Sequence, residues 1–217
     1  MKIIAHRGDH AYPENSLAAI KHAIKDKRYD GVEFDIRVSK DGKFYLLHDR
    51  TLGRTTNTRG LLSRIHSKDL KKVRLRNNER LPRFEDALKI LHEYEGIVYT
   101  ELKSHRVEKE FLSLVRKYNI KNIIVNTFSR TTLKRLRVYD KRIKLHLGVR
   151  LPVINMWRAN SIGCYSIAIP SFMITKRTMK LAKKYKIKVL PYMVFSESML
   201  ERCKRLKVDG IFADTHS

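Results

Sequence analysis

Residues 166–195, SIAIPSFMITKRTMKLAKKYKIKVLPYMVF, decide the fold class because they hold two strand signals with a helix signal between them. The short apolar run at 166–171 is typical of a buried strand. Residues 175–185 then place apolar side chains at helical spacing, with lysines between them, and 188–195 is again strand-like. A strand, a helix and a strand in this order predict two parallel strands joined by a helix that covers the sheet.

The same unit recurs along the whole chain of 217 residues. Eight segments have strand character: 2–7, 31–38, 96–103, 122–128, 143–150, 166–171, 188–195 and 210–215. Longer stretches with helical spacing follow seven of them, and 43–49 is an extension after the second segment. Eight such units favour a (β/α)8 TIM barrel over an open doubly wound sheet, which six or seven strands would also allow.

We expect a single domain over residues 1–217, because no composition shift or low-complexity linker divides the chain. The chain stops just after its eighth strand segment, so we expect the last helix to be short or absent. Its two cysteines cannot form a disulfide framework, and no apolar run has the length of a membrane span. These features predict a cytoplasmic protein, with peripheral contact at a membrane left open. The oligomeric state is left open as well.

The charge is unusual, with 47 Lys and Arg against 22 Asp and Glu, a formal net charge of +25. Such a surface attracts polyanions: nucleic acid, an anionic membrane or a phosphorylated substrate. Most basic residues fall on the helical stretches, which makes solvated helix faces the simpler interpretation. The sequence has no zinc-ligand spacing, basic tail or phosphate-binding glycine loop, so we expect no dedicated nucleic-acid binding.

Polar side chains gather where the predicted strands end, and a barrel places its chemistry at those carboxyl ends. The residues concerned are His6, Arg7, Glu33, Asp35, His48, Asp49, Glu101, Lys103 and Asp214. Residues two apart in a strand share a face, so Glu33 and Asp35 project together, as do Glu101 and Lys103. Three carboxylates on neighbouring strands suit Mg²⁺ or Ca²⁺ better than zinc. The alternative is that these acids form salt bridges with the many basic residues at the rim.

Two histidines supply the remaining chemistry. His6 and His48 can face each other across such a site as general acid and general base. Arg7 and Lys103 offer positive charge to an anionic substrate. Together with a divalent cation, these groups fit phosphoryl transfer on a phosphate ester. The other histidines, His10 among them, are expected to be structural or surface residues.

Several of these segments carry a family resemblance. AHRG at 5–8, PENS at 13–16 and VEFDIRVSKDGKFYLLHDRTLGRTTN at 32–57 closely resemble the glycerophosphodiester phosphodiesterase family. LPRFEDAL, ELK, NTFSRTTLKRLR and VDGIFADT agree with it further along the chain. The resemblance covers nearly the whole sequence in the correct order.

The resemblance implies a TIM barrel with one divalent metal ion, Ca²⁺ or Mg²⁺, held by Glu33, Asp35 and Glu101. It implies His6 and His48 as the acid–base pair, in either assignment, and Arg7 and Lys103 as phosphate contacts. The implied substrate is a glycerophosphodiester. A neighbouring hydroxyl of the substrate attacks to give a cyclic phosphate that water then opens, which yields sn-glycerol 3-phosphate and an alcohol.

The sequence departs from the family pattern in two places. Tyr192 and Phe195 stand where the family usually has Trp and, three residues on, Asn. Tyr192 can still form an aromatic wall against the substrate, but Phe195 makes the pocket more apolar. The segment between Asp49 and Pro82 is short, so we expect no sizeable inserted domain over the site. These features make a lysophospholipid, cleaved in the manner of a lysophospholipase D, the alternative substrate. A polyglycerol phosphate and a non-catalytic polyanion-binding protein are further alternatives.

Overall fold

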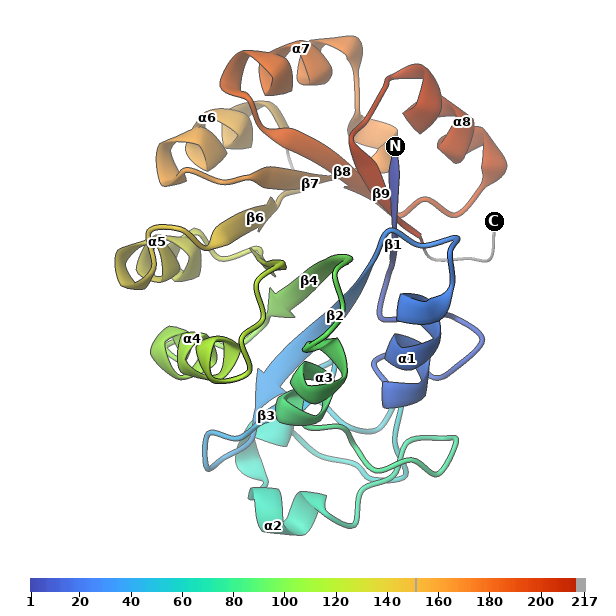
Figure 1. Cartoon of the computed structure of the whole chain (residues 1–217), viewed down its shortest axis with the longest axis vertical. Coiled ribbons are helices and arrows are strands. Elements are labelled where there is room, and N and C mark those ends of the chain that lie inside the picture. The colour runs from blue at the N-terminus through green and yellow to red at the C-terminus, as the bar shows by residue number, and fades with distance from the viewer. Residues whose placement is uncertain (151, 214–217) are drawn as a thin grey trace.

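Eight parallel strands form a barrel in the computed structural model (Figure 1). The structure describes residues 1–150 and 152–213, except for the side chains of 152–154. The hydrogen-bonded order is β8-β7-β6-β5-β4-β2-β1-β9. A parallel bridge between Val194 and Ala213 brings β8 and β9 together and closes the ring. The strands are β1 (Lys2–Ala5), β2 (Gly31–Val38), β4 (Ile97–Leu102), β5 (Ile123–Thr127), β6 (Lys144–Gly148), β7 (Ser166–Pro170), β8 (Lys188–Tyr192) and β9 (Gly210–Ala213). The predicted TIM barrel is confirmed, and the open sheet is excluded.

Helices surround the barrel and bury their apolar faces against it (Figure 1). Aromatic rings fill much of one such interface: Phe84 stacks on Phe111 at 5.5 Å between ring centroids and lies 6.2 Å from Phe34. Ser16 caps α1 by accepting a hydrogen bond from the Ala19 amide. The covering helices are α1 (Leu17–Lys25), α3 (Phe84–Leu91), α4 (Glu108–Lys117), α5 (Arg130–Tyr139), α6 (Pro152–Ile162), α7 (Lys176–Tyr185) and α8 (Glu197–Arg205).

The interior of the barrel is a packed layer rather than a channel. Tyr99 and Phe212 meet edge to face at 5.1 Å, and His146 packs edge to face against both rings. His146 is fully buried, and burial lowers its pKa to about 3, so the ring is neutral. Its Nδ1 lies 2.6 Å from the Ser166 hydroxyl. These side chains form a solid floor beneath the carboxyl ends of the strands.

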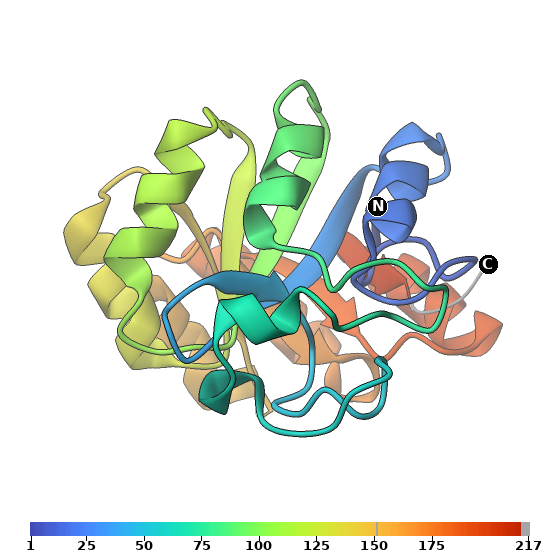
Figure 2. The same ribbon diagram turned by 90° about the horizontal axis from the view of Figure 1, so that it is seen from below.

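The extension after β2 forms a hairpin with it. β3 (Phe44–Leu46) pairs antiparallel with the end of β2, with Ile36 opposite Leu46. Residues 50–82 then form a small lobe that contains a 3₁₀ turn, Leu62–Arg64, and α2 (Ser67–Leu70), gathered below β2 and α3 in Figure 2. The lobe has an apolar cluster of its own: Tyr45, Leu47, Leu52, Leu62, Leu70, Val73, Leu75 and Leu81.

Two further expectations concern the end of the barrel and the absence of a membrane-spanning segment. Asp214 and any helix after β9 lie outside the described residues. Within the part of the chain that the structure describes, every helix is too short or too polar to span a bilayer.

Candidate active site

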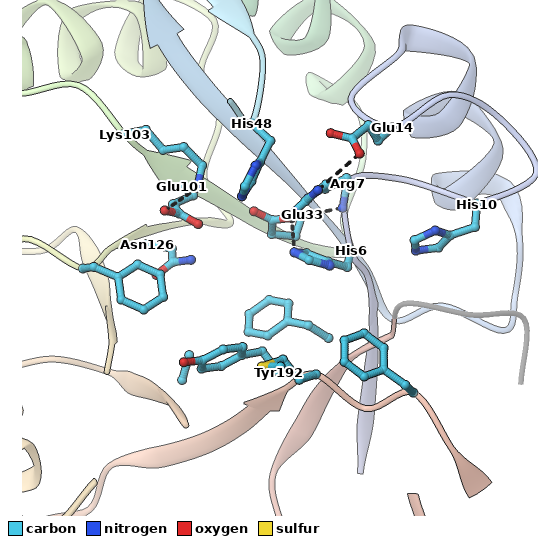
Figure 3. Close-up of a pocket in the computed structure, with 15 residues that line it drawn as sticks. His6, Arg7, His10, Glu14, Glu33, His48, Glu101, Lys103, Asn126 and Tyr192 are labelled. Carbon is cyan, nitrogen blue, oxygen red and sulfur yellow. Dashed lines mark hydrogen bonds and ion pairs between the residues drawn. The ribbon is translucent and has the colours of Figure 1, made fainter. Parts of the chain in front are cut away.

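A pocket of about 420 Å³ opens at the carboxyl ends of the strands (Figure 3). It lies where barrels of this type place their chemistry. Asp35 does not line the pocket but lies fully buried beside it. The other residues predicted as catalytic, metal-binding or substrate-binding line it: His6, Arg7, Glu33, His48, Glu101, Lys103 and Tyr192.

The three carboxylates form one compact cluster because of the strand register. Asp35 on β2 is paired directly with Glu101 on β4, and Glu33 lies two residues earlier on the same face of β2. Each of the three offers an oxygen within 4.8 Å of the others. Burial, and then the charge of Asp35, raises the pKa of Glu33 to about 8 and also raises the pKa of Glu101.

Asp35 stays ionised although it is fully buried. Burial alone would raise its pKa, but Lys103, His48 and Arg7 outweigh that effect and hold the pKa below its usual value. Lys103 Nζ lies 3.2 Å from Oδ1, and Arg7 Nε lies 3.5 Å from Oδ2. Asn15 donates to Oδ2 at 3.0 Å and accepts from the Asp35 amide at 2.9 Å. These contacts fix the orientation of the carboxylate.

The cluster fits a divalent cation. Oε1 of Glu33 is buried and receives no hydrogen bond from any described residue. An unpaired buried oxygen and a raised carboxyl pKa both indicate that the cluster is short of positive charge. Its donors are all oxygens, which suits Mg²⁺ or Ca²⁺. The residues that would hold the ion are Glu33, Asp35 and Glu101.

His6 and Arg7 come from the turn that follows β1. His6 donates its backbone N–H to Ala213 at 3.2 Å, and its Nε2 lies 3.8 Å from Oε2 of Glu33. Arg7 adopts a left-handed backbone with φ of 60°, and its N–H donates to the same Glu33 oxygen at 3.0 Å. This conformation, rare outside glycine, presents the Arg7 side chain to the pocket.

His48 follows β3 and is held by its neighbour in sequence. Its Nδ1 lies 2.7 Å from Oδ1 of Asp49, so Nε2 is the nitrogen that remains for the pocket. Burial lowers the pKa of His48, although Asp35 and Asp49 both act to raise it. His48 is therefore mainly neutral at pH 7. Figure 3 shows the rings of His6 and His48 turned toward Glu33 from opposite sides.

The structure adds residues that the sequence analysis did not single out. His10 is an exposed residue of the turn after β1, as expected, but it also lines the pocket, and its Nε2 lies 3.2 Å from the Ala213 carbonyl. Glu14 accepts from Arg7 Nη1 at 3.2 Å, and Asn126 of β5 completes the polar wall. Glu14 lies within the PENS motif, which was the one available signal.

The wall opposite the histidines is apolar. Tyr192 donates its hydroxyl to the Val149 carbonyl at 3.1 Å, which holds the ring at the edge of the pocket (Figure 3). Phe128, Met193 and Phe195 line the same side, and each leaves 40% or more of its surface exposed. No residue of 51–82 lines this pocket among those described, so the small lobe leaves its mouth uncovered.

Comparison with known proteins identifies the family. A model of the glycerophosphoryl diester phosphodiesterase family matches residues 6–216. The chain belongs to this family. Membership makes it a phosphoric diester hydrolase by class, and the match covers the whole pocket.

Relatives agree along the full length of the chain. A glycerophosphodiester phosphodiesterase of Caldanaerobacter subterraneus is 28% identical over 98% of this chain and 93% of its own. A glycerophosphodiester phosphodiesterase from Agrobacterium tumefaciens has a similar structure, with a TM-score of 0.86 at 24% identity over 99% of this chain and 96% of that one. An Oleispira antarctica phosphodiesterase solved with its product sn-glycerol-3-phosphate has a TM-score of 0.85 at 23% identity, over 99% and 93% of the two chains. Both likenesses show the same fold.

Proposed function

We propose that this protein is a metal-dependent glycerophosphodiester phosphodiesterase that releases sn-glycerol 3-phosphate and an alcohol. The observation that carries the proposal is the carboxylate cluster of Glu33, Asp35 and Glu101 with His6 and His48 beside it in one pocket. Family membership supports the activity, as does the product bound to the Oleispira protein. The expected single domain and cytoplasmic location remain predictions.

The reaction uses the residues in distinct roles. A divalent ion at the cluster, when bound, supplies positive charge to the phosphodiester. Arg7 and Lys103 add to that charge and orient the phosphate. His48, which is neutral, takes the proton from the substrate's neighbouring hydroxyl as that oxygen bonds to phosphorus, and His6 protonates the alcohol oxygen as its bond to phosphorus breaks. Water then opens the cyclic phosphate while the two histidines exchange roles.

The test is release of sn-glycerol 3-phosphate from glycerophosphocholine and glycerophosphoglycerol. We expect His6→Ala and His48→Ala each to lower kcat by roughly 10²-fold or more, the usual contribution of a general acid or base. Exhaustive dialysis against EDTA abolishes activity, and Ca²⁺, Mg²⁺ or Mn²⁺ restores it. His66→Ala is the matched control, since His66 is exposed and has no capping hydrogen bond. Full activity in the His6 variant or after chelation contradicts the proposal.

One observation favours a second substrate. Phe128, Met193 and Phe195 form an exposed apolar surface at the mouth of the pocket. Such a surface can hold the acyl chain of a lysophospholipid at an anionic membrane, in a reaction of the lysophospholipase D type. Mass spectrometry of products from lysophosphatidylcholine, with free choline and lyso- or cyclic phosphatidic acid as the expected signals, separates this activity from the first.

A further inference from the structure

Large apolar side chains are exposed around the mouth of the pocket, in the loops that follow three strands. Phe128 follows β5, Phe172 follows β7, and Met193 and Phe195 follow β8. Each leaves between 40% and 58% of its surface exposed. We call these four residues the apolar rim. Phe172 does not line the pocket, so contact with a bound substrate does not account for its exposure.

Packing and backbone conformation hold the apolar rim in this exposed position. Ser171 donates its hydroxyl to the Met193 carbonyl at 2.7 Å, which joins the loop after β7 to the loop after β8. Met193 has a left-handed backbone with φ of 61°, a conformation that costs free energy outside glycine. Phe128 meets the ring of Tyr192 edge to face at 6.2 Å between ring centroids. The rim is therefore a defined surface rather than a set of loose loop residues.

Exposed cations lie at the same end of the barrel, at the starts of two helices. Arg130 is the first residue of α5, and Lys176 and Arg177 are the first two of α7. Among the described residues, none of the three has a carboxylate within ion-pair distance. Neither helix has an acid in its first turn. The helix dipole disfavours cations at this position, so helix stability does not explain them.

An anionic lipid surface matches this combination of groups. Apolar side chains can enter the interface between headgroups and acyl chains, while cations beside them contact anionic headgroups. Exposed apolar surface next to a pocket is typical of a site that contacts another molecule or a membrane. A nucleic acid would use the cations and could stack its bases on the phenylalanines, but Met193 would have no role in such a contact.

We propose that the apolar rim, with the cations at the starts of α5 and α7, docks this protein on an anionic membrane so that the mouth of the pocket faces the lipid. The apolar side chains supply affinity for the bilayer, and the cations select bilayers with anionic headgroups. The inference goes beyond the proposed function, because hydrolysis of a soluble glycerophosphodiester makes no use of Phe172 or of the helix starts.

Sedimentation with large vesicles tests the surface without any turnover. One set of vesicles is phosphatidylcholine, and the other is an equal mixture of phosphatidylcholine and phosphatidylglycerol. We expect the wild type to bind the mixed vesicles more tightly by about tenfold or more, with the preference falling as salt is added. Phe172→Ser should lower the affinity for mixed vesicles by roughly tenfold, because a large apolar side chain no longer enters the interface. Its hydrolysis of soluble glycerophosphocholine should equal that of the wild type.

Two matched controls locate the surface. Val138→Ser removes an exposed apolar side chain near the carboxyl end of α5, at the opposite end of the barrel, and should leave vesicle binding unchanged. Lys176→Gln with Arg177→Gln removes two charges from the first turn of α7, and we expect this pair to lower the affinity for mixed vesicles by about tenfold or more. Lys183→Gln with Lys184→Gln removes the same charge from the last turn of that helix and should lower the affinity far less.

The outcomes separate the docking surface from the proposed function. A wild type that binds neither kind of vesicle, or a Phe172→Ser variant that binds as the wild type does, overturns the docking surface. Equal losses in the two paired variants of α7 mean attraction by net charge alone and overturn it too, as does binding to a short DNA duplex without binding to vesicles. A protein that binds vesicles but hydrolyses no glycerophosphodiester in the presence of metal overturns the proposed function and leaves the docking surface standing. Thermal unfolding checks that each variant is folded.

Discussion

Asp49 and Arg54 belong to a chain of charged contacts that runs from His48 to Arg7. Asp49 contacts His48 at 2.7 Å, and Arg54 Nε donates to Asp49 at 2.6 Å. The Nη1 and Nη2 atoms of Arg54 donate to the Glu14 carboxylate at 2.6 and 2.7 Å. The same carboxylate also accepts a hydrogen bond from Arg7. Arg54 belongs to the small lobe, so the lobe holds His48 and Arg7 in place without lining the pocket.

This chain predicts the effect of Asp49→Asn. The contact with Arg54, more than that with His48, lowers the pKa of Asp49, so the residue is a stable anion that orients the imidazole. We expect kcat to fall by roughly 10²-fold, since a misoriented base loses most of its contribution. The hydrogen bond to the Asp49 carboxylate also raises the pKa of His48. A neutral amide weakens that effect, so the variant shifts the acid limb of kcat/KM to lower pH. A pH profile of kcat/KM measures both effects.

Asp69→Asn is the matched control for this prediction, because Asp69 is an exposed acid of the same lobe on α2. We expect its pH profile to match the wild type. A profile of Asp49→Asn that falls in height with no shift of its acid limb contradicts the assigned electrostatic role, and an unchanged rate contradicts the positioning role.

The residues that could be predicted at this scale are those whose signal is local. Glu33 and Asp35 alternate on one strand, and His6 with Arg7 directly follows another, so strand geometry alone places them at one end of a barrel. Arg54 and His10 could not be found in this way. Their partners lie 40 and 203 residues away in the sequence, and only the packed chain brings them together.

The turn between β1 and α1 is the element on which the pocket depends most. It carries His6, Arg7 and His10, and it passes so close to α1 that a side chain at Gly8 has no room. Gly8 has φ of +85°, and a Cβ there would lie 2.6 Å from Cβ and 2.8 Å from the backbone carbon of Ala19. The glycine is therefore required both for its backbone conformation and for the contact with the helix.

Gly8→Ala should therefore destabilise the protein and misplace the pocket residues beside it. We expect a loss of roughly 2–4 kcal/mol, the sum of a left-handed alanine and an overpacked contact, together with lower activity. Gly42→Ala is the control, since Gly42 has φ of +75° with no atom within 4 Å of an added Cβ, and it should lose only the backbone part, roughly 1 kcal/mol. Urea unfolding compares the two variants, and equal losses contradict the close contact.

The strands and helices could be predicted from sequence where they belong to the repeated strand–helix unit. The eight parallel strands each precede a region of helical spacing or close the chain, so the barrel could be inferred from the alternation. The lobe at 50–82 has no such signal, because its helices are only a few residues long and its apolar residues follow no single period. Its cluster of buried leucines forms against Tyr45 and Leu47 of the β2–β3 hairpin, which is a tertiary contact.

The whole molecule combines a strongly basic surface with a buried acidic centre. Burial, followed by the charge of Asp35, raises the pKa of Glu33 from 4.5 to about 8. Between pH 4.5 and about 8, Glu33 is protonated in the folded protein but ionised in the unfolded chain. The contribution of Glu33 to the free energy of unfolding therefore falls as pH rises over this range. A bound divalent cation replaces the missing proton as the source of positive charge, and it binds the ionised carboxylates.

Metal should therefore stabilise the fold, and more so at high pH. At a concentration of 100 times its Kd the ion contributes about 2.7 kcal/mol, which for a chain of this size is a rise in Tm of roughly 5–10 °C. We expect the rise in Tm on adding Ca²⁺ or Mg²⁺ to EDTA-treated protein to be larger at pH 8.5 than at pH 6, measured by thermal denaturation.

Glu33→Gln removes the titrating group, so the metal-free variant should lose less stability over this pH range than the metal-free wild type. If the Tm of the metal-free wild type and that of metal-free Glu33→Gln change equally with pH, the assigned role of the Glu33 pKa is wrong. If metal leaves the Tm unchanged at both pH values, the metal site is wrong.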